Sequence, residues 1–388
     1  MRLELILPRV EPMAMTLPDT CPYEECQGTH FRHHQEVSKP LRDTIYRQVV
    51  VHRYACLRCG RSFRVYPMGV SKAQTSQRVQ GLAVMLYLLG LSYGAVSLVL
   101  EALGTYLCKS RVYDIVQVAA EQVPGLKRER IFEEVQTPAL GGDVTSVKCN
   151  GRWLPLGLSV DDTTGLVLSV DDLSGEDAET LKDWLAPVAE AVGAEILVTD
   201  DADAFKTVAD ELGMEHQVCK SHVTRNTEAL IESLGLAAAQ DGDGSLADIG
   251  VSSEQALADL ARLGQLIQSR QPDEQSELET LHRRYLKAAP PQAGERASAA
   301  YRLRLLFLDR WNLWSRLTRY RTWQGPQGQT LDGTNNGSER AIGWWIKERY
   351  RTMRGYKRPK SAVNISRLLA WAGNHLATGG ADLALLIA

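Results

Sequence analysis

Several kinds of segment are missing from this 388-residue sequence. No apolar run reaches the roughly 20 residues of a transmembrane helix, so we expect no membrane partner. Met1-Arg2-Leu3 does not open a signal peptide, which favours a cytoplasmic location. The sequence also lacks a P-loop, a dinucleotide-binding glycine pattern, a Ser/His/Asp signature and internal repeats. These absences exclude the common nucleotide-binding and serine-hydrolase classes.

Cysteine is scarce, and four of the seven cysteines form two close pairs. Cys21 and Cys26 are followed thirty residues later by Cys56 and Cys59. Such pairs indicate a metal site in a reducing compartment rather than disulfides. Four thiolates would form a tetrahedral structural Zn²⁺ site, and Gly60 suits the turn of the second pair. Any one of three nearby histidines could instead replace one of the cysteines as a ligand: His30, His33 or His34.

Acidic residues are rare in two long stretches. Residues 39–111 contain 11 Lys and Arg against 2 Asp and Glu, and residues 296–367 contain 16 against 4. Residues 143–295 contain 11 basic and 29 acidic residues. Two basic blocks around an acidic centre fit a nucleic-acid partner and a cation-binding middle. A mixed, solvated surface is the competing interpretation.

The pattern after the first cysteines predicts one strand and three helices. Residues 44–54 alternate like a strand, and the helices are expected at 75–91, 93–103 and 109–120. Three helices with short turns are typical of a helix-turn-helix unit, and we predict that Lys109 and Arg111 contact DNA. A three-helix unit without a nucleic-acid role is the alternative.

The acidic centre predicts a sheet of order βββαβαβ, which is the order of ribonuclease H-like domains. Asp143 lies among uncharged residues of the first strand, and Asp200 follows the apolar fourth strand. We interpret Asp161 and Asp162 as turn residues. The expected strands are 139–148, 152–160, 165–170, 195–199 and 216–219, with helices at 178–192 and 204–212.

Glu339 is a carboxylate in a strongly basic segment. The preceding residues predict a turn, and we expect Ser338 to cap the following helix. Ile342 and Ile346 would share a face with Glu339, so its carboxylate would turn toward the core and need a partner such as a cation. Stabilisation of a first-turn glutamate by the helix dipole is the competing interpretation.

Together these motifs resemble bacterial insertion-sequence transposases of the DDE type. The resemblance implies that Asp143, Asp200 and Glu339 are catalytic and hold two Mg²⁺ ions, with Mn²⁺ able to substitute. It also implies that Cys219 and His222 form a structural CxxH motif. The matching segments are Gly142-Asp143, Val198-Thr199-Asp200, Cys219-Lys220-Ser221-His222 and Thr334-Asn335-Asn336-x-x-Glu339-Arg340.

The same resemblance implies partners and a location. The protein would bind double-stranded DNA at terminal inverted repeats and at target sites, as a dimer or larger homo-oligomer, and associate with the bacterial nucleoid. Many DDE enzymes carry Lys or Arg seven residues after the glutamate, but Ile346 stands there, followed by Lys347. The further predicted DNA contacts are Trp323, Arg340, Lys347, Arg351 and Arg354.

The predicted organisation is an α/β multidomain chain. A zinc ribbon (1–70) and a helix-turn-helix domain (71–130) precede a ribonuclease H-like core with a mixed five-stranded sheet (135–226). An α-helical insertion (227–333) interrupts this core, and residues 334–388 complete it with the Glu339 helix and basic helices. We expect residues 235–253 to be loop-like and Trp311 and Trp314 to be core residues.

The predicted activity is metal-dependent cleavage and strand transfer of DNA. Two rival functions remain: a nuclease without strand transfer, and a catalytically inactive, domesticated zinc-dependent DNA-binding regulator.

Overall fold

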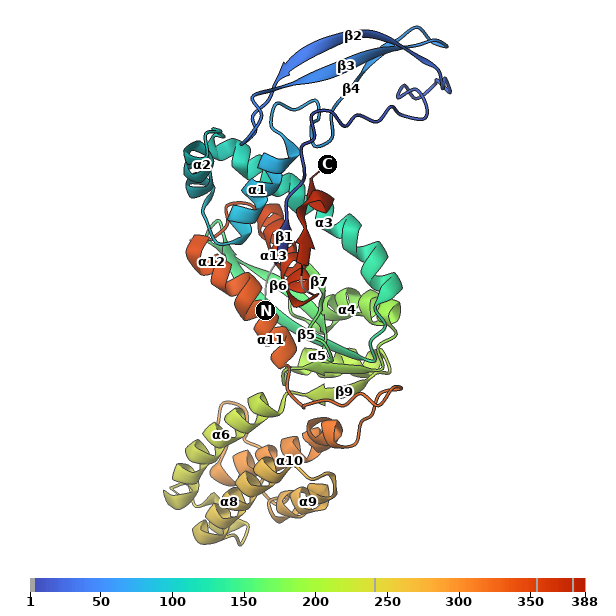
Figure 1. The fold of residues 1–388 in the computed structure, drawn as a ribbon. Coiled ribbons are helices and arrows are strands. Elements are labelled where there is room, and N and C mark those ends of the chain that lie inside the picture. Colours follow the sequence, from blue (N-terminus) through green and yellow to red (C-terminus); the bar gives the residue numbers. More distant parts are fainter. Residues whose placement is uncertain (1–3, 241, 354, 379, 388) are drawn as a thin grey trace. The chain divides into compact units, whose positions relative to one another are not determined.

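The computed structural model describes residues 4–240, 242–353, 355–378 and 380–387. Within these residues no helix has the length and apolar character needed to span a membrane. The chain divides into two compact units. Figure 1 labels the helices and strands. The first comprises residues 1–133, 147–154 and 343–388, and the second comprises residues 134–146 and 155–342. The C-terminal helices, which we predicted to complete the catalytic core, therefore group with the N-terminal part from residue 343 onward.

The first unit begins with a three-stranded antiparallel sheet. Its strands are β2 (Phe31–Pro40), β3 (Gln48–Cys56) and β4 (Ser62–Val65), in the order β2-β3-β4. Val49 and Val51 of β3 are buried in a small apolar cluster. The sequence pattern predicted only the middle strand.

Three helices follow, as predicted: α1 (Gln77–Leu88), α2 (Tyr93–Ala102) and α3 (Lys109–Glu134). Ser76 and Ser92 cap α1 and α2, because their side chains accept the backbone N–H groups of Val79 and Ala95. α3 continues well past the predicted end at residue 120.

The C-terminal segment of the first unit packs with these helices. It contains α12 (Glu348–Met353) and α13 (Pro359–Thr378), and β10 (Gly380–Asp382) pairs in parallel with β1 (Glu4–Ile6). Arg349 donates to the carbonyl oxygens of Gly90 (2.5 Å) and Leu91 (2.7 Å) and lies over the Tyr87 ring. These bonds satisfy carbonyl groups at the end of α1.

The second unit contains the predicted mixed five-stranded sheet. The order is β7-β6-β5-β8-β9; β6 and β7 are antiparallel, β5 is parallel to β8, and β8 is parallel to β9. This is the strand order of a ribonuclease H-like core. The strands are β5 (Ala139–Cys149), β6 (Arg152–Asp161), β7 (Val167–Asp172), β8 (Ile196–Thr199) and β9 (Glu215–Val218).

Two helices connect the parallel strands: α4 (Ala178–Val192) and α5 (Asp203–Glu211). Asp177 caps α4 by accepting the Thr180 N–H at 3.0 Å, and Gly193 ends it in the left-handed conformation (φ 70°). The apolar side chains of α4, including Leu181 and Leu185, are buried. The helix therefore covers one face of the sheet.

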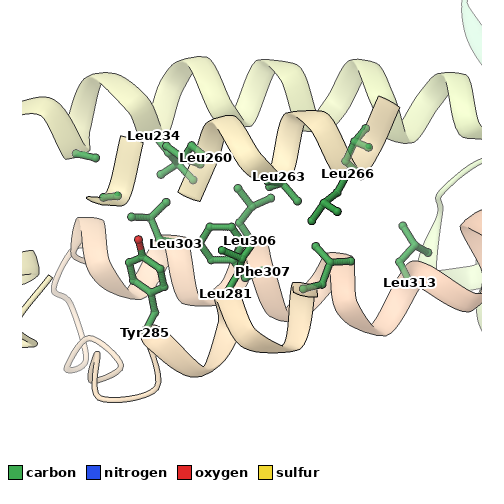
Figure 2. Packing of buried hydrophobic residues seen from close by; sticks show 14 of the residues in the cluster. Leu234, Leu260, Leu263, Leu266, Leu281, Tyr285, Leu303, Leu306, Phe307 and Leu313 are labelled. Atoms are coloured by element: carbon green, nitrogen blue, oxygen red, sulfur yellow. The ribbon is translucent and has the colours of Figure 1, made fainter. Parts of the chain in front are cut away.

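The insertion between β9 and residue 333 is helical and has a core of its own (Figure 2). Leu263, Phe307 and Trp314 are fully buried within it, as expected for Trp314. The predicted loop at 235–253 is wrong in its first part, because α6 continues to Gln240. The helices are α6 (Lys220–Gln240), α7 (Ser245–Asp248), α8 (Ser253–Ser269), α9 (Gln275–Arg284) and α10 (Ala299–Thr318), with short turns η1 (Pro272–Glu274) and η2 (Arg319–Arg321).

Candidate active site

The first two predicted carboxylates lie near the same ends of two paired strands. The parallel strands β5 and β8 pair Leu140 with Leu197 and Gly141 with Val198. Asp143 lies two residues after the last of these pairs on β5, and Asp200 directly follows Thr199, the last residue of β8. The same register, continued by two residues, would make them neighbours at the strand spacing of about 4.8 Å.

Gly141 shows which helix covers the face that carries Asp143. Residues two apart in a strand lie on the same face of the sheet, so Gly141 and Asp143 lie on one face. A Cβ at Gly141 would lie 2.7 Å from Val160 Cγ2 and 2.9 Å from Ser338 Oγ, whereas Gly142 faces Leu185 of α4. The helix α11 (Asn336–Ala341) therefore crosses the Asp143 face at close range. Glu339, one residue after Ser338, belongs to this helix.

The start of α11 differs from the prediction. The helix begins at Asn336 with Asn335 as its N-cap residue, so Ser338 is an interior residue rather than the cap. Ser338 is fully buried against the sheet, and the Glu339 N–H donates to Asn335 O at 3.0 Å. The Glu339 side chain is 43% exposed. Its carboxylate is thus open to solvent rather than turned into the core as we predicted.

The CxxH motif contacts the predicted catalytic glutamate. His222 Nε2 lies 3.5 Å from Glu339 Oε1, and ligand atoms of Cys219, His222 and Glu339 lie within 4.8 Å of one another. The Cys219 N–H donates to Thr199 O at 2.8 Å, which fixes the start of α6 at the end of β8. The spacing in the sequence predicted a structural motif but not its glutamate partner.

The aspartates after β8 have different roles. Asp201 is paired with Lys206 Nζ at 2.9 Å and lies 3.9 Å from Arg310 Nη1, so it joins the loop to the insertion. Burial lowers the pKa of Lys206, but its bonds to Asp201 and Asp203 outweigh this and raise the pKa. Asp200 accepts the Ala202 N–H at 3.1 Å and forms no ion pair within the described ranges. This difference supports Asp200 over its neighbour as a metal ligand.

Asp162 belongs to this region, although its sequence context indicated only a turn. Added Cβ atoms at Gly141 and Gly337 would each lie 3.4 Å from Asp162 Oδ1. Burial and the charges of Asp332 and Asp161 raise the pKa of Asp162 to about 7. Asp161, by contrast, accepts hydrogen bonds from three threonine hydroxyls at 2.6–2.7 Å and fixes the turn as predicted. No sequence signal separates these two aspartates.

The four predicted zinc ligands form one cluster in the first unit. The Sγ–Sγ distances are 3.9 Å for Cys21 and Cys59 and 3.7 Å for Cys26 and Cys56, and all four thiols are free. Zn–S bonds of about 2.3 Å in a tetrahedron separate neighbouring sulfurs by about 3.8 Å, so the cluster is compatible with Zn²⁺. None of the three competing histidines belongs to this cluster. Gly60 adopts φ +72°, as its turn requires.

The residues that we predicted to contact DNA differ in their exposure to solvent. Lys109, Arg340 and Lys347 are exposed, and Arg111 is half-buried. Arg354 and the Arg351 side chain lie outside the described part of the chain.

The DNA contact predicted for Trp323 is not supported by its position. Its side chain is 5% exposed and packs with Ala139, Ile196 and Val198, so it is a core residue. Trp344, which the sequence reasoning missed, is 75% exposed. An exposed tryptophan between basic residues is a better candidate for contact with a base.

No family model and no curated protein matches this chain. Similar solved structures include the HTLV-2 integrase catalytic core in complex with magnesium (23% identity, 28% of this chain and 77% of that chain, TM-score 0.19). The BIV integrase catalytic core (14%, 50% and 90%, TM-score 0.19) and the catalytic domain of the Mos1 mariner transposase (14%, 51% and 91%, TM-score 0.18) are similar too. With TM-scores this low, the matches place none of the site residues.

Proposed function

We propose that this protein is a DDE-type DNA transposase that cleaves DNA at transposon ends and joins the freed 3′-hydroxyl to target DNA. One observation carries the proposal. The β5–β8 register, continued by two residues along each chain segment, would set Asp143 beside Asp200, and the closeness of Gly141 to Ser338 lays the Glu339 helix across the same face. Three carboxylates from β5, the end of β8 and α11 would then converge at one end of the sheet.

The donors at this end of the sheet suit hard divalent cations. Asp143 and Asp200 are partly exposed, Glu339 is open to solvent, and carboxylate oxygens are the ligands that Mg²⁺ and Mn²⁺ take. These three residues would hold two Mg²⁺ ions, which when bound activate the attacking oxygen and stabilise the leaving oxygen of a phosphodiester.

His222 is a positioning residue in this proposal. Its imidazole faces the Glu339 carboxylate at 3.5 Å and comes from α6, whose first turn is held at the sheet by Cys219. Asp143 lies on β5, and Asp200 directly follows β8. In this proposal, secondary structure would hold the three groups in place before DNA binds, as transfer between two nucleic-acid ends requires.

We assign DNA recognition to the first unit and to the basic residues after Glu339. The zinc ribbon and the α3 residues Lys109 and Arg111 would read the terminal repeats, and Arg340 and Lys347 would contact phosphates. Residues Ile342–Lys347 form a π-helix, which adds one residue to the helical count. Because of this extra residue, the eighth residue after Glu339 points in about the direction that the seventh has in a regular α-helix. This supports Lys347 as the counterpart of the Lys or Arg that the resembling enzymes carry. Assembly as a homo-oligomer on paired ends is part of the proposal.

Strand transfer with labelled transposon ends and Mg²⁺ tests the catalytic residues. Asp143→Asn, Asp200→Asn and Glu339→Gln should abolish both cleavage and joining while leaving end binding intact. Asp203→Asn is the matched control, because its side chain is 97% exposed and only three residues from Asp200. Wild-type activity in any one of the first three variants would remove that residue from the site.

The same assay separates the rival functions. A nuclease would cleave the ends without joining them, and a domesticated regulator would bind the ends without any chemistry. Either result with the wild-type protein would refute the transposase proposal.

A further inference from the structure

Two histidines and a glutamate gather on the β2–β3 hairpin, away from the four cysteines. His33 and Glu36 lie on β2, and His52 lies on β3. His33 is paired with Tyr54 and Glu36 with His52 in the antiparallel register. Neither the zinc ribbon nor the proposed catalysis uses these three side chains.

A β-bulge explains how His33 and Glu36 share a face. Residues three apart in a regular strand point to opposite faces. Here the register shifts between His33 and Gln35, which inserts one extra residue into β2. His52 and Tyr54, two residues apart on β3, share a face, so their partners Glu36 and His33 share it as well. The bulge thus brings three metal-binding side chains onto one face.

The side chains are close enough to bind one ion. His52 Nε2 lies 3.6 Å from Glu36 Oε1, and the His33 and His52 ring centroids are 5.3 Å apart. One ligand atom from each of the three residues lies within 4.8 Å of the other two. Ligands at about 2.1 Å from a tetrahedral ion are about 3.4 Å apart, so small side-chain rotations complete the geometry.

The surroundings restrain the rings and leave room for an ion. Tyr54 packs edge-on against His33 with centroids 5.4 Å apart, and Tyr54 in turn stacks on Phe63 of β4. His33 and Glu36 are exposed and His52 is half-buried, so the face is open to solvent. An ion held there would have an open coordination position for water.

We infer that His33, Glu36 and His52 form a second metal site, which binds a divalent transition-metal ion such as Zn²⁺. Two imidazoles and one carboxylate are a donor set that suits zinc, copper or nickel better than Mg²⁺. The site would tie β2 to β3 beside the bulge, where the regular ladder is interrupted. Cys56 lies opposite Phe31, where β2 begins and β3 ends, so the four-cysteine cluster lies at the open end of the same hairpin.

Zinc stoichiometry of the full-length protein tests the inference. Equilibrium dialysis against Zn²⁺ would be carried out with excess Mg²⁺ to occupy the carboxylate site. We expect wild-type protein to bind one more equivalent of Zn²⁺ than His52→Ala or Glu36→Gln. His34→Ala is the matched control, because this exposed histidine lies within the bulge outside the cluster, and it should bind as much zinc as wild type.

A second measurement excludes misfolding as the cause. Zinc released by a thiol-modifying reagent reports the four-cysteine cluster and should be the same in all four proteins. Equal total zinc in wild type and His52→Ala would overturn the inference, as would retention of the extra equivalent in Glu36→Gln.

Discussion

The contact between Gly141 and α11 can be tested with one methyl group. Gly141→Ala would place a Cβ 2.7 Å from Val160 Cγ2 and 2.9 Å from Ser338 Oγ, both closer than real Cβ contacts. Gly142→Ala is a matched control on the next residue of the same strand, where the added Cβ would lie 3.5 Å from Leu185 Cδ2, an ordinary contact. The two variants add the same group to opposite faces of β5.

The size of the effect of Gly141→Ala depends on how far Val160 and Ser338 can move away from the added methyl group. Val160 is fully buried and β-branched, so its side chain has little rotational freedom. Overpacking of this kind costs about 1–3 kcal/mol of folding free energy. A shift of α11 away from the sheet relieves the Ser338 contact and carries Glu339 with it. Displacing a catalytic group by about 1 Å lowers the rate by about 100-fold.

The assay measures cleavage of labelled ends at saturating Mg²⁺ and thermal unfolding for both variants. We expect Gly141→Ala to remain folded, with a lower unfolding temperature and cleavage slowed by about 100-fold. Gly142→Ala should stay close to wild type in both measurements. Full cleavage activity in Gly141→Ala would refute the close packing of α11 on the Asp143 face.

Four further predictions concern other parts of the chain. Gly28→Ala should lose the structural zinc, because a Cβ there would lie 2.6 Å from Cys56 Sγ; full zinc content by atomic absorption would contradict this. Asp162 has a folded pKa of about 7 against an ordinary 3.8, so the folded state keeps its proton where the unfolded state has lost it. Stability without metal should therefore fall as pH rises from 4 to 7, by up to about 4 kcal/mol, and urea unfolding should show no such fall for Asp162→Asn. An unchanged pH dependence in that variant would exclude Asp162 as its source. Trp344→Ala should weaken end binding, measured by fluorescence anisotropy, by about tenfold if the ring stacks on a base, and unchanged affinity would exclude stacking. Trp323→Ala should instead lower stability, because this ring is buried.

The sheet was predictable because its strands are apolar and separated by strong turn signals. β2 was not, because ten largely exposed, mostly polar residues show no apolar alternation and become a strand only by pairing with β3. The end of α6 was missed because the Asp241-Gly242-Asp243-Gly244 run made the whole of 235–253 look like a loop. In the structure Gly235 lies inside the helix and faces Leu257 of α8, where a small residue allows close helix packing.

The candidate site was predictable only in part. Asp143 stands out in the sequence because it interrupts the uncharged residues of a strand. Asp200 stands out because it directly follows an apolar strand. The contact of His222 with Glu339 and the environment of Asp162 depend on segments more than one hundred residues apart in the chain, and no local pattern encodes them. The capping role expected of Ser338 was wrong, because α11 starts three residues earlier and buries this hydroxyl against β5.

The helical insertion has a consequence for the order of folding. Its two ends meet at the sheet, where the Lys220 N–H donates to Gly333 O at 2.8 Å. Closing an unstructured loop of about 110 residues would cost about 4 kcal/mol of chain entropy. The insertion lowers this barrier, because its own leucine-rich core holds α6 and α10 together and returns the chain to the sheet. We therefore expect the insertion to fold before α11 docks, so that the last carboxylate joins the other two only at the end of folding.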